Sequence, residues 1–147
     1  MYRRQSNGYL FAGIVFVLCA LAFGACETVI AVKFSINVTD RLKRAADANT
    51  VGTAIKELDS VISYLEQNDV TEGYTSVIYE TPDEDVGFWY NNLKSSLVEL
   101  RSLPENSTTL EKSNALMKLR ETILDSSKSS DKVTKPDEIS RFPSNLA

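Results

Sequence analysis

The sequence predicts an all-α protein: a single N-terminal transmembrane helix followed by a small three-helix domain, a long helix plus an antiparallel hairpin. Two observations support this fold class. An apolar run fills most of the first 32 residues, and later segments repeat apolar residues at the three- and four-residue spacing of a helix face. The expected division is an N-terminal tail at 1–8, the transmembrane helix at 9–32, a helical domain at 33–125 and a disordered tail at 126–147.

The apolar run has the length of a membrane span. Tyr9 to Cys26 is a stretch of eighteen residues without a charge, and after Glu27 the run resumes up to Val32. A spanning helix needs about 20 residues at ~1.5 Å each. We therefore expect a single-pass membrane protein that is in contact with membrane lipid.

Two alternatives use the same residues. Arg3 and Arg4 before an apolar core, with Ala20-Leu21-Ala22 as a small-residue cleavage site, are also typical of a secretory signal peptide. The tetrapeptide Phe23-Gly24-Ala25-Cys26 is similar to a bacterial lipobox. That resemblance implies a lipoprotein anchored through Cys26.

Charge is distributed unevenly along the chain. From Lys33 to Lys56 there are five basic residues and two acidic ones, whereas Glu57 to Asp85 holds nine acids and no base. We expect a basic end near the membrane, which suits anionic headgroups, and an acidic distal end, which argues against nucleic acid as a partner. The arginines near the N-terminus favour an inside N-terminus and an extracytoplasmic polar domain.

The first helix of the domain is expected over about Val38 to Glu66. Its second half carries a regular apolar stripe that also has the spacing of a coiled-coil seam: Val51, Ile55, Leu58, Ile62 and Leu65. A connection rich in loop residues follows at 67–81. Connections of this length in compact domains are often functional.

The second and third helices begin with capping signals. Thr81 as the N-cap, Pro82 as the first helical residue and Glu84 as the capping-box partner predict the start of the second helix. Thr108 and Glu111 predict a second capping box. The second helix has the apolar stripe Val86, Trp89, Tyr90, Leu93, Leu97 and Leu100. The predicted shared core is Ile62, Leu65, Trp89, Leu93, Leu97, Met117 and Leu124.

The composition offers little for catalysis or cofactors. There is no histidine, and both cysteines, Cys19 and Cys26, lie in the apolar run. The commonest general base and metal ligand is therefore missing, and the polar domain has no thiolate. We expect no enzymatic activity, no cofactor and no metal site.

One surface stands out as a candidate for interaction. Six of the thirteen aromatic residues fall between 64 and 90, within or beside the acid-only stretch. Rings and carboxylates together suit a protein interface or a cationic ligand, although aromatic rings also fill small cores. The candidate residues are Tyr74, Tyr79, Asp83, Asp85 and Phe88. Phe88 points away from the stripe that contains Leu97, and we expect its ring to pack under the 67–81 loop rather than to face a partner.

The most economical interpretation is a structural or protein-interaction subunit of a membrane-associated complex. An anchor, a small domain and the absence of catalytic residues all agree with it. The partner would be another protein or a second copy of the chain. The alternative is an extracytoplasmic sensor-like ligand-binding domain, because the layout resembles a reduced form of helical-bundle receptor domains.

Overall fold

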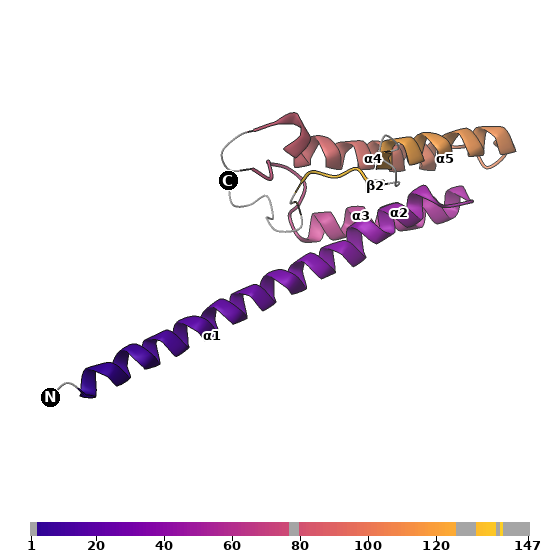
Figure 1. The fold of residues 1–147 in the computed structure, drawn as a ribbon. Coiled ribbons are helices and arrows are strands. Elements are labelled where there is room, and N and C mark those ends of the chain that lie inside the picture. Colours follow the sequence, from indigo (N-terminus) through magenta and orange to yellow (C-terminus); the bar gives the residue numbers. More distant parts are fainter. Residues whose placement is uncertain (1–2, 77–79, 126–131, 138, 140–147) are drawn as a thin grey trace.

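The computed structural model describes residues 3–76, 80–125, 132–137 and 139. These residues form an all-helical protein apart from one short strand pair (Figure 1). The elements are α1 (Arg3–Phe34), η1 (Ser35–Thr39), α2 (Asp40–Ala46), α3 (Val51–Gln67), η2 (Pro82–Glu84), α4 (Val86–Ser102), α5 (Thr109–Ile123), β1 (Leu124–Asp125) and β2 (Lys132–Val133).

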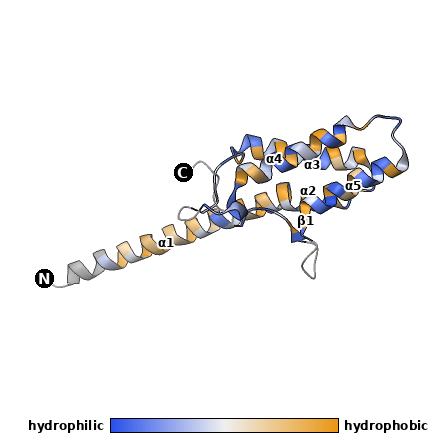
Figure 2. Cartoon of the chain, turned by 90° about the horizontal axis from the view of Figure 1, so that it is seen from above, coloured by the Kyte–Doolittle hydropathy of each residue, from blue (hydrophilic) through white to orange (hydrophobic). Residues whose placement is uncertain are grey.

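Helix α1 projects from the rest of the molecule. It is apolar over most of its length and leads into α2, which packs in a bundle with α3, α4 and α5 (Figure 2). Its large apolar side chains from Tyr9 to Val32 are exposed to the surroundings rather than packed against the protein. By length and composition it is the one helix of the described chain that suits a membrane span.

The prediction of one long helix over 38–66 is wrong, and so the three-helix arrangement does not hold. The chain leaves the helical conformation after Ala46 and starts α3 at Val51, where the Thr50 side chain accepts a hydrogen bond from the Thr53 backbone N–H at 3.2 Å. Because α2 and α3 pack side by side, the chain reverses direction at 47–50. In the described part of the chain, the bundle therefore consists of four helices, α2, α3, α4 and α5.

The phase of the apolar residues explains this reversal. On one continuous helix at ~100° per residue, the buried positions Leu42, Ala45 and Ala46 would face roughly 180° away from the stripe that starts at Val51. No single neighbouring surface buries two opposite faces. Reversing the chain at 47–50 brings both faces into one core.

A π-helical turn, η1, joins α1 to α2. Phe34, Val38 and Leu42 are all buried and lie four residues apart. In an ideal α-helix, residues four apart advance by about 40° per step, so this set would drift round the helix. The wider turn of η1 offsets the drift and keeps the three side chains on the bundle side.

The predicted core is correct except at one position. All residues of the α4 stripe are buried, as are Ile62, Leu65 and Leu124. Met117 is 59% exposed, however, because α5 turns Leu119 and Ile123 toward the bundle. The predicted Thr108–Glu111 capping box is present at the start of α5. The predicted start of α4 is displaced: Pro82–Glu84 forms the short helix η2, and Asp85 is the N-cap of α4.

The prediction of a disordered tail from Ser126 onward is wrong for the part of the tail that the structure describes. Strand β2 pairs antiparallel with β1, and Val133, Pro136 and Ile139 are buried. These apolar side chains lie in a stretch of polar residues, and burying them against the bundle holds the segment in place. Residues 126–131, 138 and 140–147 lie outside the described residues.

Candidate functional site

The 67–81 connection and the start of α4 lie at the end of the bundle where α1 enters. Phe34 is the last residue of α1. The Nζ of Lys135, in the segment beside the start of α4, lies 5.9 Å from the centre of the Phe34 ring. Phe34 also packs edge-on against Tyr64 near the end of α3, with ring centres 6.4 Å apart. The expectation of an acidic distal end is therefore wrong, because the reversal at 47–50 brings the C-terminal end of α3 back to α1.

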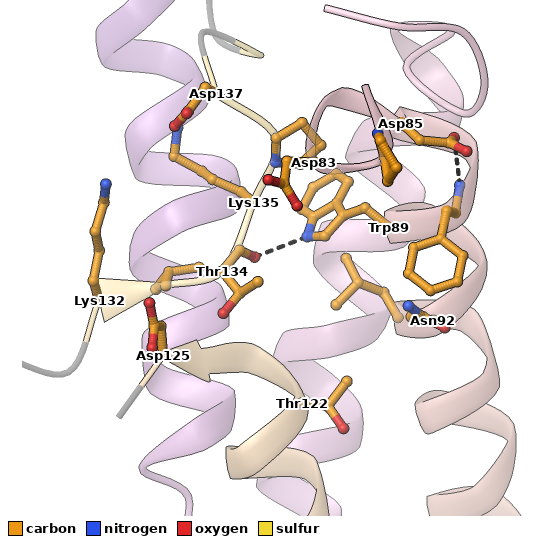
Figure 3. Close-up of a pocket in the computed structure, with 15 residues that line it drawn as sticks. Asp83, Asp85, Trp89, Asn92, Thr122, Asp125, Lys132, Thr134, Lys135 and Asp137 are labelled. Atoms are coloured by element: carbon orange, nitrogen blue, oxygen red, sulfur yellow. Dashed lines mark hydrogen bonds between the residues drawn. The ribbon is translucent and has the colours of Figure 1, made fainter. Parts of the chain in front are cut away.

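A cavity of about 400 Å³ opens at this end of the bundle (Figure 3). Three stretches of chain line it: residues from 82–93 at the start of α4, and residues from 122–125 and 132–137, about 30 or more positions further along the chain. Trp89 joins two of them, since its indole Nε1–H donates to the backbone oxygen of Thr134 at 2.9 Å. The cavity therefore depends on the C-terminal segment being in place.

The cavity has an apolar floor and a charged rim. Its buried lining residues are Trp89, Leu93, Val133 and Pro136. Its charged lining residues are Asp83, Asp85, Asp125, Lys132, Lys135 and Asp137. Small-molecule sites commonly combine a mostly apolar surface with a few polar groups that fix orientation. The arrangement suits a ligand or side chain with both an apolar and a charged part.

Backbone hydrogen bonds hold the connection against the start of α4. The Val86 N–H donates to the Gly73 oxygen at 2.9 Å, and the Thr75 N–H donates to the Glu84 oxygen at 3.1 Å. Gly73 has a φ of 91°, a left-handed conformation that glycine adopts without steric cost. Between these bonds, Tyr74 forms a bridge with Asp85.

Of the predicted surface residues, the structure gathers four. Asp83, Asp85 and Phe88 line the cavity, and Tyr74 lies next to them through its bridge with Asp85. Asp85 has a structural role: its Oδ1 accepts a hydrogen bond from the Phe88 backbone N–H at 2.8 Å and so caps α4. Tyr79 lies outside the described residues.

The prediction that Phe88 packs under the loop is wrong. Its side chain is 64% exposed at the edge of the cavity, while Tyr74 is 37% exposed. The helix phase placed Phe88 opposite the buried stripe, and the bridge between Tyr74 and Asp85 leaves the loop beside the ring rather than over it. Exposed aromatic rings at a cavity are common anchors for partners.

Sequence reasoning missed the contribution of the C-terminal segment. Lys132 and Lys135 supply the positive charge of the rim, and Val133 supplies part of the floor. The available signal was the spacing of Val133, Pro136 and Ile139 in an otherwise polar tail. Burial lowers the pKa of Lys135, nearby Lys132 adds to that effect, and Asp137 opposes it.

Sequence reasoning also missed a buried ion-pair group away from the cavity. Glu57 is 3% exposed, and its Oε1 and Oε2 accept from Arg44 Nη2 at 2.7 Å and Arg41 Nη1 at 3.1 Å. Two of the basic residues that the charge pattern assigned to lipid headgroups are therefore paired with a buried carboxylate, although their own side chains stay in contact with solvent. The pairing links α2 to α3 across the reversal.

A second polar cluster links α3 to α4. The Tyr90 hydroxyl donates to Glu66 Oε1 at 2.6 Å, and Lys94 Nζ donates to the Tyr90 oxygen at 3.2 Å. Burial, followed by the hydrogen bond to Glu66, raises the pKa of Tyr90. The same hydrogen bond lowers the pKa of Glu66. Each group has a structural partner, and we assign the cluster to the packing of these helices.

Among the residues that the structure describes, no group of three or more acidic or cysteine side chains is placed to hold a metal ion. Every buried side-chain nitrogen or oxygen in that same part of the chain has a hydrogen-bond partner. No protein-family model matches the chain, and searches of curated proteins and of solved structures give no significant match.

Proposed function

We propose that the chain is a single-pass membrane protein whose helical bundle serves as an interaction subunit of a membrane-associated complex. The observation that supports this best is the unbroken helix from Arg3 to Ala46. Its first part exposes apolar side chains to the surroundings, and its last part buries Val38 and Leu42 in the bundle. An anchor of this kind would hold the bundle at a fixed height above the bilayer.

The proposed interaction surface comprises Tyr74, Asp83, Asp85 and Phe88. Its support is the pair of exposed rings beside a cavity, at the end of the bundle nearest α1. A partner in the same membrane would reach this surface without extending away from the bilayer. The proposal includes no catalytic role, because the sequence lacks histidine and has cysteine only in the apolar run.

Anchoring is tested by flotation and extraction. The full chain, reconstituted with phospholipid vesicles, should float with them and should resist extraction at alkaline pH. Intact-mass measurement of the membrane-bound protein distinguishes the alternatives that use the same residues. A mass that begins at an acylated Cys26 would indicate a lipoprotein, and a chain released without its first 22 residues would indicate a signal peptide.

Orientation is a separate part of the proposal. Arg3 and Arg4 precede the apolar run, which favours an inside N-terminus and an extracytoplasmic bundle. Protease added to intact cells or spheroplasts should remove the bundle and spare α1. Full protection of the bundle would reverse the proposed orientation.

The interaction role is tested with a matched pair of variants. Phe88→Asp changes an exposed residue at the cavity, whereas Leu110→Asp changes a 70% exposed residue near the opposite end of the bundle. A partner that co-purifies from detergent with the native chain should be lost with Phe88→Asp and retained with Leu110→Asp. Equal capture by both variants would contradict this choice of surface.

A sensor-like ligand-binding domain is the second candidate, and the cavity of about 400 Å³ favours it. This volume lies within the range of ~300–1,000 Å³ typical of small-molecule sites. A sensor should show a ligand-dependent rise in melting temperature in the absence of any protein partner. A subunit should instead be stabilised by its partner.

A further inference from the structure

The cavity lies close to the point where α1 would leave the bilayer. Phe34 follows the apolar segment 9–32 by two residues, a rise of ~3 Å along the helix. Lys135, which lines the cavity, has its Nζ 5.9 Å from the centre of the Phe34 ring. Headgroup layers extend roughly 5–8 Å beyond each face of the hydrocarbon core. If α1 spans the membrane, the side of the cavity that Lys135 lines is therefore at headgroup depth.

Two of the rim carboxylates are already engaged in other contacts, and the remaining charged residues of the rim balance in sign. Asp85 caps α4, and Asp125 already takes part in another interaction. That leaves two carboxylates and two ammonium groups around the cavity: Asp83, Asp137, Lys132 and Lys135. Within the described part of the chain, the carboxylates of Asp83 and Asp137 form no hydrogen bond or ion pair, although Asp137 is close enough to Lys135 to oppose the lowering of that lysine's pKa by burial. A ligand with one positive and one negative group matches this balance.

The aromatic residues fit the positive part of such a ligand. The Trp89 indole lies in the floor, and the exposed Phe88 ring stands at the edge. Aromatic faces attract quaternary ammonium groups, and tryptophan is enriched at membrane interfaces. An exposed phenylalanine is also less costly beside a bilayer than in water.

From these observations we infer that the cavity binds the zwitterionic headgroup of a membrane phospholipid, such as phosphatidylcholine. The ammonium group lies among Asp83, Asp137 and the Trp89 indole, and the phosphate faces Lys132 and Lys135. The inference rests on the proposed membrane span. It deepens the proposed function by giving the bundle a lipid contact of its own at the end nearest the bilayer.

Trp89 provides the readout, because it is the only tryptophan in the chain. The full chain is reconstituted in nanodiscs that contain phosphatidylcholine with a nitroxide on its headgroup, and the quenching of Trp89 fluorescence is titrated against labelled lipid. The test variant is Asp83→Asn/Asp137→Asn. The control, Glu105→Gln/Glu121→Gln, removes two exposed charges from the α4–α5 link and from α5.

The native chain and the control should be quenched at low fractions of labelled lipid. The test variant should need a roughly fivefold higher fraction of labelled lipid for the same quenching. This is the effect expected from the loss of two partly exposed charge contacts. Equal quenching of the native chain and the test variant would overturn the inference, as would the absence of quenching in a chain that floats with vesicles. A chain that fails to float would instead overturn the proposed span.

A nitroxide-labelled choline, free in solution and at the same molar ratio, tests the other source of this chemistry. It should quench Trp89 less than the labelled lipid does, because the bilayer holds the lipid headgroup beside the cavity. Stronger quenching by the free molecule would show that the cavity serves a soluble ligand and would overturn the membrane source.

Discussion

The ammonium group of Lys135 lies 5.9 Å from the centre of the Phe34 ring, so the C-terminal segment contacts the last residue of the apolar helix. The two residues are 101 positions apart in the chain. Through this contact, the segment that completes the cavity is tied directly to the proposed anchor.

Replacing Phe34 with alanine tests that junction. The ring is buried against Tyr64 and Lys135, and its loss should lower the free energy of unfolding by ~3 kcal/mol. Thermal unfolding of the full chain in detergent, followed by circular dichroism, measures the change. Phe23→Ala, at an exposed position of α1, is the control and should leave the bundle transition unchanged.

Leu97→Ala and Met117→Ala form a pair that tests the packing of the bundle. Leu97 is buried in the core, and its truncation should lower the free energy of unfolding by roughly 2–5 kcal/mol. Met117 is exposed, so the same change there should cost less than about 0.5 kcal/mol. Comparable losses at the two positions would mean that α5 presents a different face to the core.

Glu57→Gln tests the buried charge between α2 and α3. The substitution keeps the size of the side chain but removes the charge that Arg41 and Arg44 contact. Because both arginines retain access to water, the expected loss is about 2 kcal/mol, below that for a fully buried pair. Chemical denaturation in detergent should show this loss, whereas Glu121→Gln on the exposed surface of α5 should show none.

The capping box of α5 should make part of the stability depend on pH. The backbone N–H of Thr108 donates to Glu111 Oε2 at 2.7 Å, and this bond lowers the pKa of the Glu111 carboxyl. Since the pKa in the folded state is below the unfolded value, this contribution is present at neutral pH. It is lost as the pH falls through the lowered folded pKa.

Thr108→Ala removes the other half of the same capping box. It should cost ~1 kcal/mol at neutral pH, in the usual range for an N-cap. Glu111→Gln should reduce the acid sensitivity of the melting temperature relative to the native chain. Identical pH profiles for the native chain and Glu111→Gln would contradict this role of the carboxyl.

The sequence by itself determined the local features of this protein. The apolar run, the buried stripe of α4 and the capping box at Thr108 depend on residues within one or two helical turns, and each is present in the structure. Composition and position also singled out Asp83, Asp85 and Phe88, which line the cavity. These properties follow from helical periodicity and side-chain chemistry over short distances.

Only the tertiary structure decided where the acidic connection lies relative to α1. No glycine or proline marks the reversal at 47–50, and its signals are the capping residue Thr50 and the phase difference between the stripes of α2 and α3. The contact of Trp89 with Thr134 likewise joins residues 45 positions apart. Such contacts depend on how whole helices pack, because burying the apolar faces of four helices and a short C-terminal segment in one core fixes them together.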